Sequence, residues 1–208
     1  MKLIDLKVKE YLDILLSDAP APGGGSVSAL AGAQAAALMG MGCDLTTSKA
    51  KYEEYHDTCK VAKVKADLLY RGFAEGVDKD TEAYNLVANA FKMPKETDEE
   101  KQARSEAIQR ETKYAAQVPM EVARAVYAVL PQIDAVAQKG NSNAVTDACV
   151  SMMCARTAIL GALLNVRINL TSIKDEAFVT AMREEADTIE THTILQEQAL
   201  LEYAKTIL

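Results

Sequence analysis

One carboxylate lies where helical periodicity predicts an apolar side chain. In the segment FAEGVDKDTEAYNLVANAFKMPK, residues 73–95, Asp80 falls in the middle of an apolar arc of about 80° on a helical wheel. The arc is made by Leu69, Phe73, Val77, Tyr84, Val87 and Phe91. The neighbouring acids Glu75, Asp78 and Glu82 fall on the opposite side, where we expect hydrated charges. Asp80 is therefore the acid that this segment predicts to be dehydrated.

The predicted dehydration of Asp80 allows two interpretations. A carboxylate that loses water must be paired, hydrogen-bonded or protonated. Burial can raise its pKa into the range that serves proton transfer, which makes Asp80 a candidate catalytic residue. Alternatively, Asp80 is a structural acid that pairs with an arginine or caps a neighbouring helix. Asp80 is the best single candidate for chemistry in the chain.

A glycine-rich stretch precedes the second predicted helix. The sequence SDAPAPGGGSVSALAGAQAAALMGMG covers residues 17–42, and Ser26 is expected to be the N-cap of a helix over 26–46. The free amides of Gly23, Gly24 and Gly25, together with the helix dipole, could bind an anion. The stretch lacks the GxxxxGK[ST] pattern of a phosphate loop, and no GxGxxG follows a strand. A flexible entry to a close-packed helix explains the same residues, so both interpretations stand.

Residues 139–175 predict a helix with a narrow face of small side chains. Ala or Ser occupies positions 144, 148, 151, 155 and 162 of that face, which would let a helix or a ligand approach closely. Asp147, Asn165 and Asn169 lie at its edge. Asp147 and Asn165 share a wheel angle, but they are 18 residues apart, about 27 Å along a straight helix. They therefore either belong to separate sites or contact different subunits.

The other polar residues of this helix also have two interpretations each. Asn143, Asn165 and Asn169 could read a flat heterocycle through paired donors and acceptors, although helix capping explains Asn143 equally well. Arg156 and Arg167 share an apolar face, where each is either a buried ion-pair partner or an anion contact.

Helical periodicity dominates the chain and predicts an all-α fold. We expect a single-domain bundle of about six to eight helices over residues 1–208, with the glycine-rich loop before the second helix. The expected helices cover 2–16, 26–46, 49–92 (with an interruption near Gly72 and Gly76), 97–138, 143–171 and 174–207. Thr97 and Glu100 form a capping box, and Pro119 and Pro131 are expected to kink the fourth helix.

The composition favours helices and argues against several classes of partner. The chain is 49% hydrophobic but only 5% aromatic, so Ala, Val, Leu and Met fill the core. A net charge of −7 with dispersed basic residues argues against nucleic acid. The four cysteines include no CxxC pair and the two histidines lack ligand-type neighbours, so we expect reduced thiols and no metal. Residues 27–43 are expected to fall short of a membrane span, and the N-terminus does not resemble a signal peptide. We expect a cytoplasmic protein that binds no membrane.

Three segments together resemble the formiminotransferase-cyclodeaminase C-terminal family, which includes free-standing bacterial methenyltetrahydrofolate cyclohydrolases. They are APAPGGGSVSALAGA (19–33), DKDTEAYNLVANAFKMPKET (78–97), and GNSNAVTDACV with GALLNVRINLTSIKDEAF within 140–178. They occur in the family's order and spacing across nearly the whole chain. The resemblance implies an all-helical homodimer with sites at or near the subunit interface. It also implies tetrahydrofolate substrates and no metal or redox cofactor.

The resemblance further implies roles for individual residues. The family's catalytic aspartate looks like Asp80. The substrate-binding positions of the family match Gly23, Gly24, Gly25, Ser26, Asn143, Asp147, Asn165 and Asn169. Thr146 stands where relatives often have Ser, and it keeps the hydroxyl group.

Two reactions on the same carbon follow from the resemblance. A cyclodeaminase, which we place slightly ahead, converts 5-formiminotetrahydrofolate to 5,10-methenyltetrahydrofolate and ammonia. A cyclohydrolase converts 5,10-methenyltetrahydrofolate to 10-formyltetrahydrofolate. In either reaction a dehydrated carboxylate can move protons and stabilise the positive charge over N5–C–N10. A deaminase of this length would receive its folate from a separate formiminotransferase, and a non-catalytic folate-binding or scaffold dimer is the third alternative.

Overall fold

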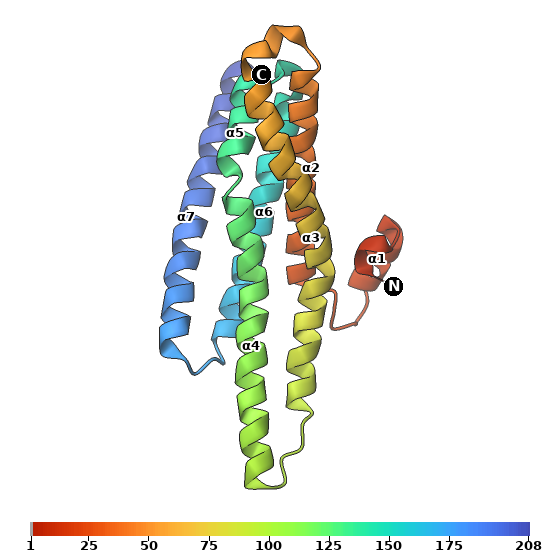
Figure 1. Ribbon diagram of the computed structural model, residues 1–208, viewed down its shortest axis with the longest axis vertical. Helices are drawn as coiled ribbons and strands as arrows, with labels where there is room; N and C mark the ends of the chain where they lie inside the picture. The colour runs from red at the N-terminus through yellow and green to blue at the C-terminus, as the bar shows by residue number, and fades with distance from the viewer. Residues whose placement is uncertain (1) are drawn as a thin grey trace.

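The computed structural model describes residues 2–208 and shows an elongated bundle of helices (Figure 1). The α-helices are α1 (Val8–Leu15), α2 (Gly24–Thr47), α3 (His56–Phe91), α4 (Asp98–Tyr127), α5 (Leu130–Lys139), α6 (Val145–Leu170) and α7 (Glu176–Ile207). Short 3-10 turns at Leu3–Asp5, Ala50–Tyr55 and Ser142–Ala144 precede α1, α3 and α6. The predicted all-α bundle of six to eight helices is confirmed.

Helix α2 is the centre of the bundle because its small side chains allow close approach from two sides. It packs against α3 and against α6, and most of its buried residues are Ala, Gly or Ser. Ser151 Oγ of α6 donates to the carbonyl of Ala35 at 2.8 Å. A Cβ atom at Gly161 would lie 2.4 Å from Ser28 Oγ, so the two helices touch almost backbone to backbone. The small-residue face predicted on 144–162 is therefore a helix-packing surface.

Helices α2 and α6 run antiparallel. Gly24 at the start of α2 lies beside Asn165, near the end of α6. At the other end of the pair, the Asn141 N–H donates to Thr46 Oγ1 at 2.9 Å. The glycine-rich start of α2 and the asparagines at the end of α6 are thus held at the same level of the bundle.

The two most apolar segments, Gly24–Thr47 and Ser142–Leu170, would be long and apolar enough to cross a membrane. Within the bundle, however, 67% and 50% of their apolar windows are buried. By length and composition, the expectation that residues 27–43 fall short of a membrane span is therefore wrong. Burial inside the bundle explains the apolar character of this helix. Half of the α6 window remains uncovered in the single chain.

Several helix boundaries follow the predicted local signals. The capping box at the start of α4 is confirmed, since Glu100 N–H donates to Thr97 Oγ1 and Thr97 N–H donates to Glu100 Oε2, both at 3.2 Å. Pro131 lies in the first turn of α5, where the chain has broken from α4, whereas Pro119 stays inside α4. The expected interruption near Gly72 and Gly76 is wrong, because α3 is continuous.

Residues 2–22 form an arm beside α3 rather than the single helix expected over 2–16 (Figure 1). The arm contains the 3-10 turn Leu3–Asp5, and the Leu3 N–H of this turn donates to Asp78 Oδ1 of α3 at 2.7 Å. The α-helix starts only at Val8. Asp78, predicted to be hydrated, is consequently half-buried. We call residues 2–22 the N-terminal arm.

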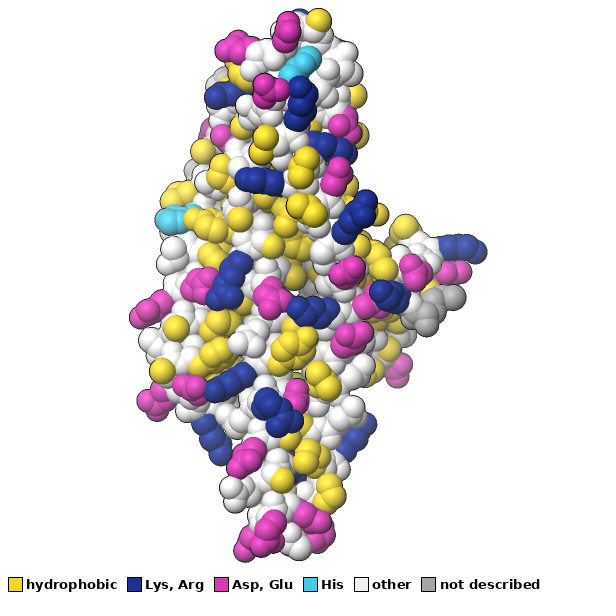
Figure 2. Space-filling model, in the orientation of Figure 1, with side chains coloured by type: hydrophobic (Ala, Val, Ile, Leu, Met, Phe, Trp, Pro, Cys, Tyr) yellow, Lys and Arg dark blue, Asp and Glu magenta, His cyan; other side chains and the backbone are white. Residues whose placement is uncertain are grey.

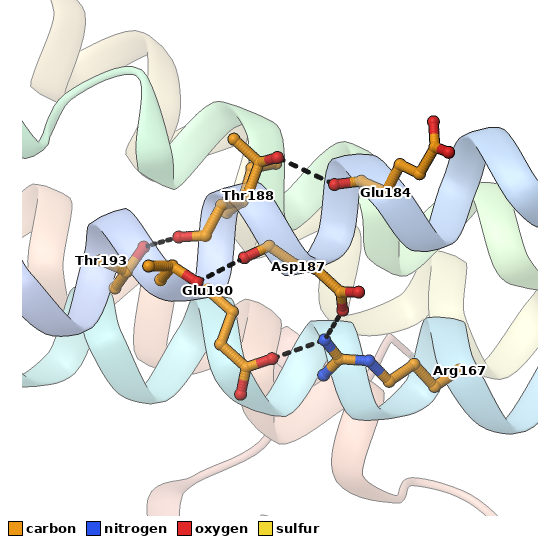
Figure 3. A network of polar contacts seen from close by, with 8 residues as sticks. Arg167, Glu184, Asp187, Thr188, Glu190 and Thr193 are labelled. Atoms are coloured by element: carbon orange, nitrogen blue, oxygen red, sulfur yellow. Dashed lines mark hydrogen bonds and ion pairs between the residues drawn. The ribbon is translucent and has the colours of Figure 1, made fainter.

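The side of the bundle seen in Figure 2 has the mixed charge of a hydrated surface, with basic and acidic side chains interspersed. Ion pairs such as Lys79 with Glu121, at 2.6 Å, link neighbouring helices. Both arginines of α6 are also paired. Arg156 Nε lies 2.9 Å from a Glu197 carboxylate oxygen, and Arg167 reaches Asp187 and Glu190 of α7 (Figure 3). The ion-pair interpretation therefore holds for Arg156 and Arg167.

The four cysteines are free thiols, three of them buried and Cys154 half-buried. Burial is the main cause that raises the pKa of the Cys43 thiol to about 12, with a smaller effect from neighbouring Cys59. A thiol with so high a pKa stays protonated and weakly reactive at neutral pH. The predicted role of the cysteines as small buried hydrophobic residues fits this arrangement.

Candidate active site

A cavity of about 370 Å³ lies where the start of α2, the second half of α3 and the end of α6 meet. Its lining residues are Pro20, Ala21, Gly23, Gly24, Gly25, Asp80, Ala83, Tyr84, Val87, Ala115, Asn165, Ile168 and Asn169. This volume lies within the range of small-molecule sites. Six predicted site residues line it together, namely Gly23, Gly24, Gly25, Asp80, Asn165 and Asn169.

The Asp80 carboxylate is pressed against the first turn of α2. A Cβ atom at Gly25 would lie 1.9 Å from Asp80 Oδ1, so a side chain at position 25 cannot coexist with this carboxylate. Ser26 Oγ lies 3.3 Å from Asp80 Oδ2 and donates to the Val77 carbonyl at 2.8 Å. The positive end of α2 therefore faces an anion that the protein itself supplies.

Ser26 reaches Asp80 because it is not the N-cap that the sequence predicts. The helix begins two residues earlier, with Gly23 as the N-cap and Gly24 as the first helical residue. Three small residues in a row let the first turn of α2 lie directly on α3. Ser26 then falls inside the helix, fully buried, with its hydroxyl toward α3.

Burial raises the pKa of Asp80, and the hydrogen bonds from Ser26 offset only part of this rise. Among residues 2–208 no Lys, Arg or His forms an ion pair with Asp80, and no charged side chain other than Asp80 lines the cavity. The arginine-paired alternative is therefore not what the structure contains. Asp80 is a dehydrated carboxylate that faces a cavity without a counter-charge.

The two asparagines differ in the hydrogen-bond donors that they leave to this cavity. Pro119 has no N–H, so the Ala115 carbonyl one turn before it loses its helical partner. Asn169 Nδ2 donates to that carbonyl at 3.0 Å and to Asn165 O at 2.9 Å. Asn165 Nδ2 donates to Gly161 O at 2.8 Å. Both amide hydrogens of Asn169 are thus used, whereas Asn165 keeps one N–H donor beside its side-chain oxygen, so paired reading of a heterocycle would rest on Asn165 alone.

Asn143 and Asp147 lie at the opposite end of α6 and do not line the cavity. Asn143 is exposed, and Asp147 is half-buried. The capping explanation for Asn143 is wrong, because Asn141 accepts from the Asn143 N–H at 3.1 Å and fills that role. Asn141 is itself buried, and its Nδ2 donates to Leu45 O at 3.0 Å.

The sequence places Tyr84 in the apolar arc of α3. In the structure Tyr84 lines the cavity and is 44% exposed. It lies one helical turn after Asp80, so its ring forms part of the wall beside the carboxylate. The sequence signal for this position is the spacing of four residues between Asp80 and Tyr84, since residues i and i+4 lie on the same face of a helix. Ile168, which is 66% exposed, extends the same apolar wall from α6.

The raised pKa of Asp80 predicts a pH-dependent cost to stability. Because the pKa in the folded state exceeds that in the unfolded state, the cost is absent below the unfolded pKa and grows as pH rises through the folded pKa. Asp80→Asn should therefore be more stable than the natural protein at pH 7.5, by about 1 kcal/mol. Thermal unfolding at pH 4 and pH 7.5 tests this, and an equal difference at the two pH values would contradict it.

The site is thus a cavity in an all-helical bundle with one dehydrated carboxylate, Asp80, in its wall, and a group of this kind can serve acid–base chemistry. The sequence profile described as formiminotransferase-cyclodeaminase matches residues 7–188, and the chain belongs to this family of folate one-carbon enzymes.

Individual relatives carry two different activities in their names. A methenyltetrahydrofolate cyclohydrolase of Methylorubrum extorquens is 38% identical, over 86% of each chain. The rat formimidoyltransferase-cyclodeaminase is 29% identical over 90% of this chain, which spans only 35% of the rat protein. The crystal structure of a formiminotetrahydrofolate cyclodeaminase from Thermotoga maritima superposes with a TM-score of 0.88, at 27% identity and 99% coverage of both chains.

Proposed function

We propose that the protein is a 5,10-methenyltetrahydrofolate cyclohydrolase. The observation that carries this proposal is the dehydrated, unpaired Asp80 in a cavity whose free side-chain oxygens are acceptors. The methenyl group is a cationic carbon between N5 and N10, so the substrate brings the counter-charge that the cavity lacks. The cyclohydrolase relative, similar over most of both chains, moves this reaction ahead of the deaminase that the sequence favoured.

In the proposed mechanism, Asp80 handles the proton of the attacking water. Water adds to the cationic carbon while the Asp80 carboxylate accepts one of its protons, giving a neutral hydroxyl adduct. The protonated Asp80 then donates to N5 as the N5–C bond breaks. The hydroxyl proton leaves to solvent, and the carbon becomes the formyl group on N10. A positioned acid–base group of this kind contributes about 10²–10⁴ in rate.

Cyclodeamination is the second candidate, and the close superposition with the Thermotoga protein favours it. N10 would attack the carbon of the protonated formimino group, Asp80 would pass the N10 proton to the departing nitrogen, and that nitrogen would leave as ammonia. The same carboxylate would stabilise the cationic product. The two reactions differ in whether the cavity receives the methenyl cation or releases it.

A direct assay separates the two reactions. The purified protein is given 5,10-methenyltetrahydrofolate and, separately, 5-formiminotetrahydrofolate, and the methenyl absorbance is followed against an enzyme-free blank. Faster loss of absorbance from the first substrate supports the cyclohydrolase. Its appearance from the second supports the deaminase, which would then take its substrate from a separate formiminotransferase. Tight folate binding without either change would identify the non-catalytic alternative.

We also propose that the protein is a cytoplasmic homodimer joined along α2 and α6. The uncovered stripe on α6 is formed by Val150, Met153, Thr157, Leu160, Leu164 and Ile168. Met41 and Leu45 of α2, 38% and 39% exposed, extend this apolar surface. The stripe is centred near Thr157, so a second copy can cover it in antiparallel fashion about a two-fold axis. That pairing would carry Asp147 and Asn143 of each chain toward the partner's cavity.

A single substitution in the stripe tests the dimer. Met153 is 42% exposed and distant from the cavity, and Met153→Glu should convert the dimer to a monomer in light scattering. Leu195→Glu, at a 57% exposed position on α7, is the matched control and should leave the mass unchanged. A natural protein that is monomeric at micromolar concentration would contradict the proposal.

Co-expression tests whether the two chains share sites. Asp80→Asn and Asp147→Asn subunits, each inactive alone, should together recover about a quarter of the natural activity if each site uses Asp147 of the partner. No recovery would contradict a site shared between the two chains.

A further inference from the structure

Ser26 lies in the first turn of α2 with its side chain fully buried, and it is not among the residues that line the cavity. Its hydroxyl oxygen has three polar neighbours on α3, namely Val77 O at 2.8 Å, Asp80 Oδ2 at 3.3 Å and Thr81 Oγ1 at 3.4 Å. A serine hydroxyl carries one hydrogen, so it can donate to one of these neighbours at a time. Because the side chain does not reach the cavity, Ser26 can act on a bound substrate only through Asp80.

The hydroxyl of Ser26 can leave the Val77 carbonyl at little cost. Val77 lies within the continuous helix α3, where its carbonyl also accepts the backbone N–H of the residue four positions later. Loss of the Ser26 hydrogen bond would therefore leave no unpaired backbone group. Thr81 can donate its own hydroxyl hydrogen to Ser26 Oγ, so it need not compete for the Ser26 hydrogen. Rotation about one bond is then enough to turn the Ser26 hydroxyl from Val77 to Asp80.

Ser26 provides the hydrogen bond that the Asp80 side chain receives within residues 2–208. Burial is the main cause that raises the pKa of Asp80, and the hydroxyl and backbone N–H of Ser26 both lower it. Tyr84 lines the cavity one helical turn after Asp80, but no hydrogen bond joins these two side chains in the described chain. Tyr84 is therefore the alternative donor that an experiment has to separate from Ser26.

The charged and titratable groups of the surrounding elements do not balance the charge of Asp80. On α3, Asp78 is bound by the N-terminal arm, and Lys79 pairs with Glu121 of α4. Tyr114 of α4 packs against the smaller core cluster, and the residues of α6 that line the cavity are uncharged. In the arm, desolvation and, secondarily, the charge of Asp80 raise the pKa of Tyr11. A contact that changes with the charge of Asp80 is thus best supplied by Ser26.

We propose that Ser26 is a positioning residue whose hydroxyl changes partner with the protonation of Asp80: it donates to the carboxylate while Asp80 is ionised, and to the Val77 carbonyl while Asp80 carries the proton. The proposal rests on the function proposed above for Asp80. A hydroxyl that donates to the carboxylate favours its charged form, so the first arrangement holds Asp80 ready to accept a proton from water. In the second arrangement this donor is withdrawn, and the acid can pass its proton to N5. A fixed counter-ion would instead favour the ionised form in both steps.

Ser26→Ala removes the hydroxyl and adds no atom to the buried site. With 13C-carboxyl-labelled aspartate, the Asp80 signal is the one missing from Asp80→Asn, and we expect its titration to move to higher pH by about one unit in Ser26→Ala. Ser151→Ala is the matched control, because Ser151 is equally buried and its hydroxyl also donates to a carbonyl of a neighbouring helix, Ala35 O, at 2.8 Å. It should leave the titration unchanged, as should Tyr84→Phe. A shift in Tyr84→Phe with none in Ser26→Ala would overturn the proposal.

The Val77 carbonyl reports the other position of the Ser26 hydroxyl, and it can be followed in the natural protein. Its 13C signal should titrate with the same midpoint as Asp80, because the hydroxyl leaves this carbonyl when Asp80 ionises. In Ser26→Ala the Val77 response should be lost, although Asp80 still titrates. A Val77 signal that does not respond in the natural protein, or that responds equally in Ser26→Ala, would overturn the change of partner.

Turnover gives an independent test. In kcat/KM, which reports the free enzyme, Ser26→Ala should move the acidic limb to higher pH by about one unit, so that rates on this limb fall about tenfold while the plateau changes little. An acidic limb that stays in place would overturn the proposal. An unchanged Asp80 titration in Ser26→Ala would overturn the role of Ser26 even if the enzyme proves active. A shifted titration in a protein inactive on both folates would support Ser26 and refute the proposed function instead.

Discussion

Asp80→Asn is expected to abolish most turnover while leaving the bundle folded. Asn keeps the shape of the side chain and can accept the Ser26 hydroxyl hydrogen bond, so the contacts with α2 survive. It has no negative charge for a cationic carbon and cannot take up a proton. We expect kcat to fall by about 10²–10⁴. Steady-state kinetics on methenyltetrahydrofolate and on formiminotetrahydrofolate provide the measurement.

The expected gain in stability makes this result diagnostic. A residue conserved for folding should lose stability when it is replaced, whereas a dehydrated carboxylate held for chemistry costs stability. Asp80→Asn should therefore be both slower and more stable at neutral pH. Natural rates on both folates would remove Asp80 from the mechanism, and a cooperative unfolding transition with unchanged helical circular dichroism is the required control.

The sequence predicts the bundle well because its helices are marked by strong local signals. The capping box at Thr97 and the break at Pro131 are local and correctly read. The predicted start of α2 is two residues too late. The prediction used the general preference for serine over glycine at N-caps, which decides the start of a helix only where no tertiary contact intervenes. Here the contact with α3 draws Ser26 into the helix. The prediction of one domain over 1–208 stays a prediction.

The helical periodicity that identifies Asp80 does not predict the burial of every residue in the same arc of α3. A wheel places Asp80 on the buried side of α3, and the structure places it there, half-buried. The same wheel places Tyr84 and Phe91 in the core, yet they are 44% and 53% exposed. The reason is that α3 and α4 extend beyond the other helices at one end, so the apolar arc has no neighbour to cover it there (Figure 1).

The remaining features of the site depend on contacts between distant segments. Asn169 is explained by Pro119, because the proline frees the Ala115 carbonyl that the Asn169 amide binds, 54 residues away. The N-terminal arm reaches the site through Pro20 and Ala21, which line the cavity, and it is tied to α3 by the hydrogen bond from Leu3 to Asp78. Neither relation leaves a motif in the sequence. Spacing within one helix was predictable, and pairing between helices was not.

Gly25→Ala carries the second large expected effect, because no other residue fits between α2 and the Asp80 carboxylate. The new methyl group would lie 1.9 Å from Asp80 Oδ1 and 2.4 Å from Cγ, so the carboxylate must move. A displacement of about 1 Å of a reacting group can cost about 10²-fold in rate. Alanine favours the helix by up to about 1 kcal/mol, while overpacking costs about 1–3 kcal/mol, so we expect a modest net loss of stability.

Gly72→Ala provides the matched control, since a Cβ atom at that position of α3 meets nothing within 4 Å. It should leave kinetics unchanged and stabilise the protein by up to about 1 kcal/mol. The decisive comparison is a double-mutant cycle in kcat/KM. If Gly25 acts by placing the Asp80 carboxylate, Gly25→Ala should slow the natural enzyme about 10²-fold and have almost no further effect on Asp80→Asn. Equal losses in both backgrounds would mean that the glycine serves the cavity by another route, such as direct contact of its amide with the substrate.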